Sequence, residues 1–184
     1  MLPTRYWITT GKGESENSVL NAVDVAFMNA GLGYQNHVIV SSIPPGEEIS
    51  PRIVSEKGLT YVPVKHEYKL LPFSSIVHVI RSMNTGSNGD EIACSIALAK
   101  GEIIIEEESS ECILAFESNG SSIIEVEEKA LDGVKNMVKI RKVKLHEKWG
   151  NSGFKIISSS LEIGAKHGCV VSFVVLDPFT YEEV

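Results

Sequence analysis

A strand-forming run in the first quarter of the chain stops abruptly at two prolines, and the fold must accommodate this break. Residues 36–41 read NHVIVS, and residues 42–46, which follow directly, read SIPPG. Proline has no backbone N–H and a fixed φ, and glycine after it favours a turn, so neither strand nor helix continues through this segment. We therefore predict a short buried strand that ends at a sharp turn, with two serines at its exit.

The rest of the chain shows more strand patterns than helix patterns. Alternating or continuous apolar runs predict strands over residues 5–10, 59–64, 75–81, 92–99, 112–117, 154–163 and 169–176. The first strand is expected to end in a Gly11-Lys12-Gly13 loop. Residues 85–90 and the charged residues 106–110 are expected to form a loop and a solvated turn.

Two segments have the spacing of an amphipathic helix. In residues 19–30 the apolar positions are Leu20, Val23, Phe27 and Ala30, with Gly31 as the stop. The second helix starts at a capping box, Ser122 and Glu125, and its apolar face holds Ala130, Leu131, Val134 and Val138. With no repeat and no long linker, residues 1–184 are expected to form one α+β domain.

Composition narrows the classes of partner. The chain has 17 Lys+Arg against 24 Asp+Glu, a net charge of −7, and 43% hydrophobic residues. A surface of this charge disfavours nucleic acid as a partner, since binding phosphates needs basic residues. No apolar run approaches the ~20 residues that a membrane span requires.

The cysteines and the N-terminus point to the cytoplasm. Residues 1–7 (MLPTRYW) lack the pattern of a secretory signal. Cys94, Cys112 and Cys169 are far apart and odd in number, which favours reduced thiols. They lack the paired spacing of zinc sites, so no metal is predicted.

Two places are candidates for chemistry. Ser41 and Ser42 leave an apolar strand at a sharp turn, where backbone strain can bring a serine hydroxyl near the preceding carbonyl; they can equally be two polar residues that begin a turn. Glu117 ends the apolar run 112–116 (CILAF). It is either an outward-facing residue at the strand's edge or a partly buried carboxyl with a raised pKa, suited to donating a proton.

Taken together, these segments resemble the pyruvoyl-dependent arginine decarboxylases. The similarity lies in residues 20–24 (LNAVD), 29–33 (NAGLG) and Asn36, then in 40–45 (VSSIPP), in 112–117 with Gly120, and in Gly168-Cys169. It covers most of the chain and is most specific through Glu48. About a dozen extra residues around 66–75 depart from the family pattern, so no pocket residue is assigned there.

The resemblance implies a fold, a cofactor and an assembly. The fold would be a four-layer αββα sandwich, and the enzyme a homotrimer of αβ units, with a hexamer left open. The cofactor would be a pyruvoyl group made from Ser42 by self-cleavage of the Ser41–Ser42 bond, giving a β chain (1–41) and an α chain (42–184). This group withdraws electrons when CO₂ leaves, as pyridoxal phosphate does. The reaction would convert arginine to agmatine.

The resemblance also implies roles for single residues. Glu117 matches the proton donor, and Asn36 matches a position beside the pyruvoyl group. Asp24 resembles the carboxylate that binds the substrate's guanidinium, and Gly33 lies in the matching glycine turn. Two alternatives remain open: a pyruvoyl enzyme for another amino acid or S-adenosylmethionine, and a trimeric binding or regulatory relative that does not process itself.

Overall fold

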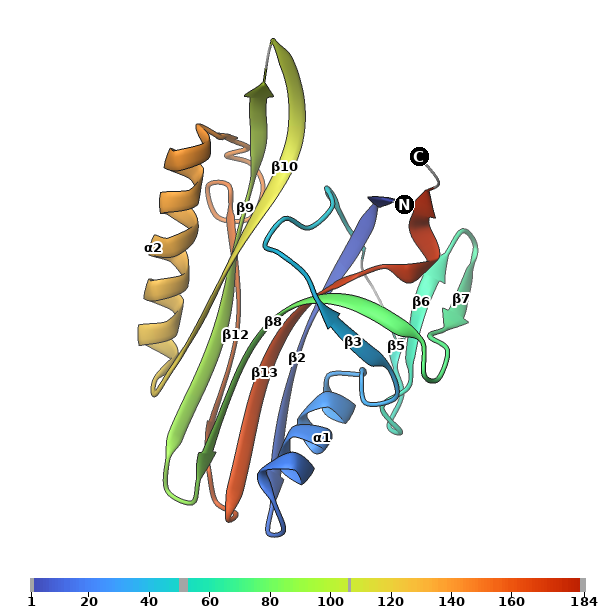
Figure 1. Ribbon diagram of the computed structural model, residues 1–184, viewed down its shortest axis with the longest axis vertical. Helices are drawn as coiled ribbons and strands as arrows, with labels where there is room; N and C mark the ends of the chain where they lie inside the picture. Colours follow the sequence, from blue (N-terminus) through green and yellow to red (C-terminus); the bar gives the residue numbers. More distant parts are fainter. Residues whose placement is uncertain (1, 50–52, 106, 183–184) are drawn as a thin grey trace.

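Long strands dominate the structure, a computed structural model that describes residues 2–49, 53–105 and 107–182 (Figure 1). The helices are α1 (Val19–Asn29), α2 (Ile123–Arg141) and a 3₁₀ turn, η1 (Pro178–Thr180). The strands are β1 (Leu2–Pro3), β2 (Arg5–Ser15), β3 (Asn36–Ile39), β4 (Glu47–Glu48), β5 (Ile53–Val54), β6 (Thr60–Val64), β7 (Glu67–Leu70), β8 (Ile76–Ser87), β9 (Glu91–Ile105), β10 (Glu108–Gly120), β11 (Lys144–Leu145), β12 (Phe154–Glu162), β13 (His167–Leu176) and β14 (Tyr181–Glu182). The predicted mixed α+β class is confirmed.

The first large sheet has five strands in the order β3-β8-β13-β2-β4. Antiparallel ladders join β13 to both β2 and β8, whereas β3 pairs with β8 and β4 pairs with β2 in parallel. The predicted buried strand at 36–41 is therefore shorter and lies at the edge of the sheet, where Val38 and Ile39 are exposed.

Gly11 and Gly13 lie inside β2, so the predicted loop at this point is wrong. A Cβ at Gly11 would lie 2.0 Å from the Ala26 carbonyl oxygen, and one at Gly13 would lie 2.2 Å from that of Ala22. The two glycines therefore allow α1 to pack directly against the strand backbone, which is a packing role rather than a turn role.

The buried face of α1 also differs from the predicted one. Its buried residues are Ala22 and Ala26, followed by Ala30 at the C-cap, while Leu20 is 77% exposed. Val23 and Phe27 pack against the edge of this cluster. Small side chains face the sheet because the glycines of β2 bring helix and strand so close together.

The second large sheet is built around β9, which pairs with β10 on one side and with β12 and β11 on the other. The helix α2 packs on it, and its predicted N-cap is confirmed: the Ser122 side chain accepts a hydrogen bond from the Glu125 N–H. Ala130 and Val134 are buried against this sheet with Leu114 and Ala97. No helix within the described residues is long and apolar enough to cross a membrane.

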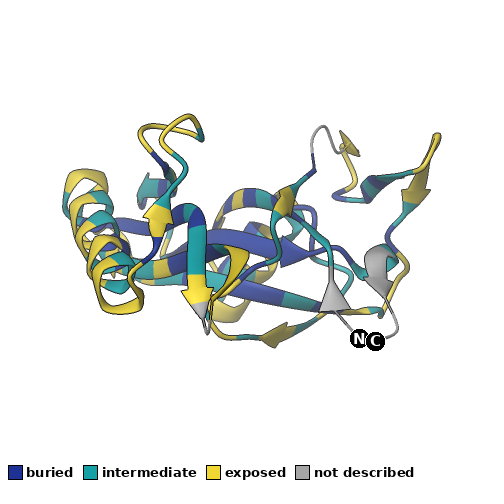
Figure 2. Cartoon of the chain, turned by 90° about the horizontal axis from the view of Figure 1, so that it is seen from above, coloured by how far each residue is buried: buried dark blue, intermediate teal, exposed yellow. Residues whose placement is uncertain are grey.

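A further hydrophobic cluster contains residues of both sheets. It holds Tyr6 and Val174 from the five-stranded sheet and Ile96, Leu98, Ile113 and Ala115 from the four-stranded sheet. Figure 2 shows the buried residues concentrated along these central strands. Val40, just before the two serines, packs against this cluster, which also contains Ala115 of β10.

The predicted loops are mostly shorter than expected. β8 continues to Ser87, so only residues 88–90 of the expected 85–90 loop turn the chain. β10 begins at Glu108, which leaves Glu107 as the described part of the turn, with φ +71°; Glu106 lies outside the described residues. The extra residues around 66–75 form β7, in a small sheet of order β5-β6-β7, and the turn into β8.

Candidate active site

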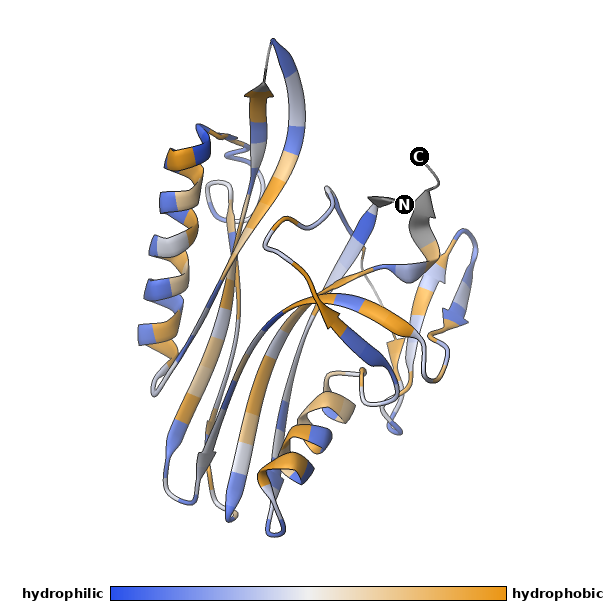
Figure 3. Ribbon diagram, in the orientation of Figure 1, coloured by the Kyte–Doolittle hydropathy of each residue, from blue (hydrophilic) through white to orange (hydrophobic). Residues whose placement is uncertain are grey.

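The chain changes sheets at the two serines. The last ladder bond of the β3 region runs from the Val40 N–H to the Val79 carbonyl oxygen of β8, at 3.0 Å. Two residues later, the Ser42 carbonyl oxygen accepts a 2.9 Å hydrogen bond from the Ala115 N–H of β10. The Ser41–Ser42 bond therefore lies in a crossing from one sheet to the other, and Figure 3 shows the hydrophobic tip of β3 leading into it.

The backbone at Ser42 forms a tight three-residue turn. The Ile43 N–H donates a 2.8 Å hydrogen bond to the Ser41 carbonyl oxygen, with Ser42 at the centre of the turn. Pro44, buried just beyond, fixes the exit. Because this N–H polarises the Ser41 carbonyl, it favours attack by a nucleophile and supports the negative charge that attack creates.

Glu117 lies against the same turn. The Ser42 hydroxyl donates to Glu117 Oε2 at 3.4 Å, a long contact between residues 75 positions apart. Glu117 is half-buried at the end of the buried run of β10. Burial raises the pKa of Glu117 above its ordinary value, and the hydrogen bonds from its own backbone and from Ser42 only partly oppose this. Of the two interpretations of Glu117, the partly buried carboxyl is confirmed.

Asn36 does not reach this pair within one chain. It is exposed at the start of β3, where its Nδ2 donates to the Ser74 carbonyl oxygen at 3.0 Å and its N–H to that of Ser75 at 2.8 Å. No hydrogen bond joins it to Ser42 or Glu117.

Asp24 and Gly33 also lie apart from the pair. Asp24 is exposed on α1 and lines a hollow of about 400 Å³ with Leu20 and Phe27. At Gly33 a Cβ would lie 2.4 Å from Met28 Cγ, so glycine is needed where the chain folds back over the end of α1. The structure thus brings together Ser42 and Glu117, and not the other predicted site residues.

One cationic residue beside Glu117 was not predicted. Arg81 of β8 lines a hollow of about 350 Å³ with Ser82 and Met83 and with Glu117, Ser118 and Asn119 of β10. The sequence held a signal for this residue, because Arg81 is a charged residue at the end of an apolar run. Alternation along the strand places it on the same face as Val77 and Val79, which pack toward α1.

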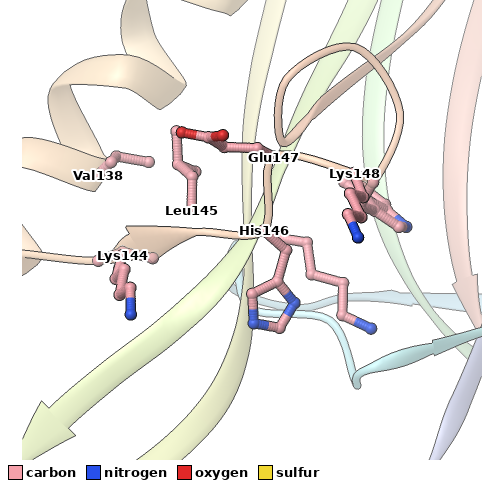
Figure 4. A pocket seen from close by; sticks show the side chains of 9 residues that line it. Val138, Lys144, Leu145, His146, Glu147 and Lys148 are labelled. Carbon is pink, nitrogen blue, oxygen red and sulfur yellow. The ribbon is translucent and has the colours of Figure 1, made fainter.

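A larger hollow, of about 920 Å³, lies elsewhere, beside α2 and the turn that follows β11 (Figure 4). Val138, Lys144 and His146 are among its lining residues, and none of the predicted site residues is. Lys100 connects it to the segment after Ser42, because its Nζ donates to the Gly46 carbonyl oxygen at 3.2 Å. The same Nζ lies 3.4 Å from Glu111 Oε2. This hollow therefore borders the segment after Ser42 without including the serine.

A tight turn at a serine with a half-buried carboxyl beside it has the groups that a serine-derived prosthetic group would need, and the comparison with known families agrees. The sequence model of the pyruvoyl-dependent arginine decarboxylase family (PvlArgDC) matches residues 5–181, so the chain belongs to this family. No curated protein matches it. The protein is thus a pyruvoyl-dependent enzyme that decarboxylates arginine.

The residues at the crossing fit the formation of the family's pyruvoyl group. A serine hydroxyl stands after a polarised carbonyl, and the Ala115 N–H fixes the carbonyl of the same serine. β10 is an edge strand that pairs with β9 on one side only. The Ala115 N–H lies on the other side, so it bonds to the crossing segment instead of to a neighbouring strand.

Proposed function

We propose that the chain cleaves itself between Ser41 and Ser42 and that Ser42 becomes the pyruvoyl group on which arginine is decarboxylated. The observation that supports this most directly is the turn, in which Ser42 donates to Glu117 while the Ile43 N–H holds the Ser41 carbonyl. The mass of the purified chain before and after processing is the experiment that tests it.

The cleavage needs no external reagent except water. The Ser42 Oγ attacks the Ser41 carbonyl carbon, the C–N bond breaks, and the hydroxyl proton ends on the Ser42 nitrogen, which leaves an ester. Loss of the Ser42 α-proton then expels the Ser41 carboxylate and leaves dehydroalanine at position 42. Water hydrolyses its imine tautomer, with release of ammonia, to the ketone of the pyruvoyl group.

In the decarboxylation itself, the group supplies an electron-withdrawing carbonyl next to the reacting carbon. The Ala115 N–H holds the Ser42 carbonyl oxygen and supports negative charge that accumulates there. Glu117, whose pKa burial raises, keeps a proton to a higher pH than an exposed carboxyl does and returns it to Cα after CO₂ leaves. In the same scheme Asn36 is a catalytic residue that hydrogen-bonds the pyruvoyl group, and Gly33 contacts the substrate.

Asp24 is proposed to bind the guanidinium of arginine. Asp24 is exposed in the single chain, and we propose that the neighbouring chain of the trimer buries it with the substrate. In Asp24→Asn, the KM for arginine is then expected to rise about 30-fold or more, since losing one partner of a buried charge pair costs at least ~2 kcal/mol. Because the contact is the same in ground and transition states, kcat changes little. Steady-state kinetics of the cleaved variant check this.

The matched control for Asp24 is Asp132→Asn, which removes another exposed helical carboxylate, on α2. It is expected to leave the KM unchanged. An unchanged KM in Asp24→Asn as well would move guanidinium recognition to another residue.

We further propose that the fold is a four-layer αββα sandwich and that three chains assemble into a trimer. The packing of α1 and α2 on different sheets, and the cluster that both sheets share, support the layering. Exposed apolar side chains near the crossing, Ile39 and Ile43, support a covering neighbour. A neighbour could also supply Asp24 and Asn36, which a single chain leaves apart from Ser42.

The trimer has a simple test. Each chain has a mass of 20.1 kDa, so light scattering on the intact Ser42→Ala protein should give about 60 kDa. A mass of about 120 kDa would indicate two stacked trimers, and one of about 20 kDa would contradict the assembly.

We also propose a cytoplasmic location, because the three cysteines are free thiols. Cys94 and Cys169 are buried and Cys112 is half-buried, and none forms a disulfide. Burial raises the pKa of Cys94 to about 11 and that of Cys169 to about 12, which keeps both as unreactive thiols.

A further inference from the structure

Arg81 lies where β8 loses its neighbour. β3 pairs with β8 only as far as Val79, and the chain then crosses to β10. Two residues further along β8, Arg81 lines the hollow that Glu117 also lines. Glu117 accepts the hydrogen bond from the Ser42 hydroxyl, so this hollow adjoins the proposed site.

The guanidinium of Arg81 lies over an aromatic ring and, in the part of the chain that the structure describes, has no carboxylate partner. Its Cζ lies 5.9 Å from the centre of the Phe27 ring, a cation–π contact. Among residues 2–49, 53–105 and 107–182, no carboxylate lies within ion-pair distance of it. Arg5, on the same sheet, pairs with the buried Asp177 at 2.5 Å. A half-buried guanidinium is costly without an anion, and its planar fork matches a carboxylate.

We propose that Arg81 binds the α-carboxylate of the substrate arginine. The inference rests on the proposed site at Ser42 and Glu117 and adds a specificity residue to it. Arginine carries a carboxylate that Arg81 attracts and a guanidinium that it repels. The two opposite charges of the site orient the substrate, with its carboxylate toward Arg81 and its guanidinium toward the Asp24 that a neighbouring chain would supply.

This arrangement also distinguishes substrate from product. Decarboxylation removes the carboxylate as CO₂, and Cα receives a proton in its place. Agmatine therefore has two cationic ends and nothing for Arg81 to bind. Arg81 favours entry of arginine and release of agmatine.

The test compares ligands that differ only in the carboxylate. In Arg81→Met, which keeps an apolar contact with Phe27, the KM for arginine is expected to rise about 10- to 100-fold, equal to about 1.4–2.8 kcal/mol. The kcat should stay the same or rise, since the charge that Arg81 stabilises is lost as CO₂ forms. The Kd of agmatine, measured by calorimetry on the cleaved protein, should stay within about two-fold or fall.

Arg141→Met is the matched control, because Arg141 is exposed at the end of α2, away from this hollow, and should change neither constant. Arg81→Lys keeps the charge without the fork and should raise the KM less than Arg81→Met. An unchanged KM in Arg81→Met, or an equal rise in KM for arginine and Kd for agmatine, would overturn the proposal. Wild-type protein that is not cleaved would instead contradict the site at Ser42, so the two failures are distinguishable.

Discussion

Ser42→Ala is expected to remain one chain of 20.1 kDa with no decarboxylase activity. The wild-type chain should give two fragments of about 4.5 and about 15.6 kDa, in proportion to residues 1–41 and 42–184. The variant has no hydroxyl to attack the Ser41 carbonyl, so neither the cut nor the pyruvoyl group can form. Mass spectrometry of freshly purified protein reads both results directly.

Ser41→Ala is the matched control for this prediction. Ser41 contributes only its backbone carbonyl, and its side chain is exposed. This variant should therefore still split between positions 41 and 42. If Ser42→Ala splits there too, the serine is not the nucleophile.

Glu117→Gln is expected to be cleaved and to assemble, yet to lose roughly 10²–10⁴-fold in turnover. Glutamine keeps the size and the hydrogen-bonding capacity toward Ser42, but it has no carboxylic proton to return to Cα. Fragment masses and kcat, measured on one preparation, separate the two effects.

The pH dependence of turnover gives a second test, because a purely structural role of Glu117 would not affect it. A proton donor acts only while protonated, so turnover should fall as pH rises through the raised pKa of Glu117. This descending limb of the pH profile should lie at a pH above the ordinary carboxyl range, and it should be absent in Glu117→Gln. Glu108→Gln, at an exposed position of the same strand, should keep both the rate and the limb. A cleaved Glu117→Gln protein with near wild-type turnover would return Glu117 to a packing role.

The strands of the core were predictable because their signals are local. Apolar runs marked β8, β9, β10, β12 and β13, with ends displaced by a few residues. Two of the errors share one physical cause, the close approach of α1 to β2. We predicted a loop at Gly11 and Gly13, whereas both lie in β2 under the helix. We predicted Leu20 in the core, whereas alanines of α1 make the contact with the strand. A glycine in a strand and a glycine in a turn look alike until the packing partner is known.

The residues of the candidate site were likewise predictable only in part from the sequence. Ser42 and Glu117 were each ambiguous alone, and their 3.4 Å contact depends on a crossing between sheets that no local pattern encodes. The roles of Asn36 and Asp24 came only from resemblance, and within one chain both lie apart from the pair. Arg81 had a signal, a charge at the end of an apolar strand, but its meaning came from the neighbouring hollow and the missing partner.

The place of β2 inside its sheet has a consequence for how the two fragments of the proposed cleavage would hold together. Residues 1–41 contain β2, whose neighbours β13 and β4 both belong to the other fragment. Tyr6 and Trp7 of this strand are fully buried, so the small fragment cannot leave without dismantling the sheet. The precursor folds as one molecule, at a rate that does not depend on its concentration. Once cut and unfolded, the same sheet forms only when two chains meet, so recovery falls on dilution. The proposed cut would thus turn a unimolecular fold into an assembly whose lifetime is set by how slowly it opens.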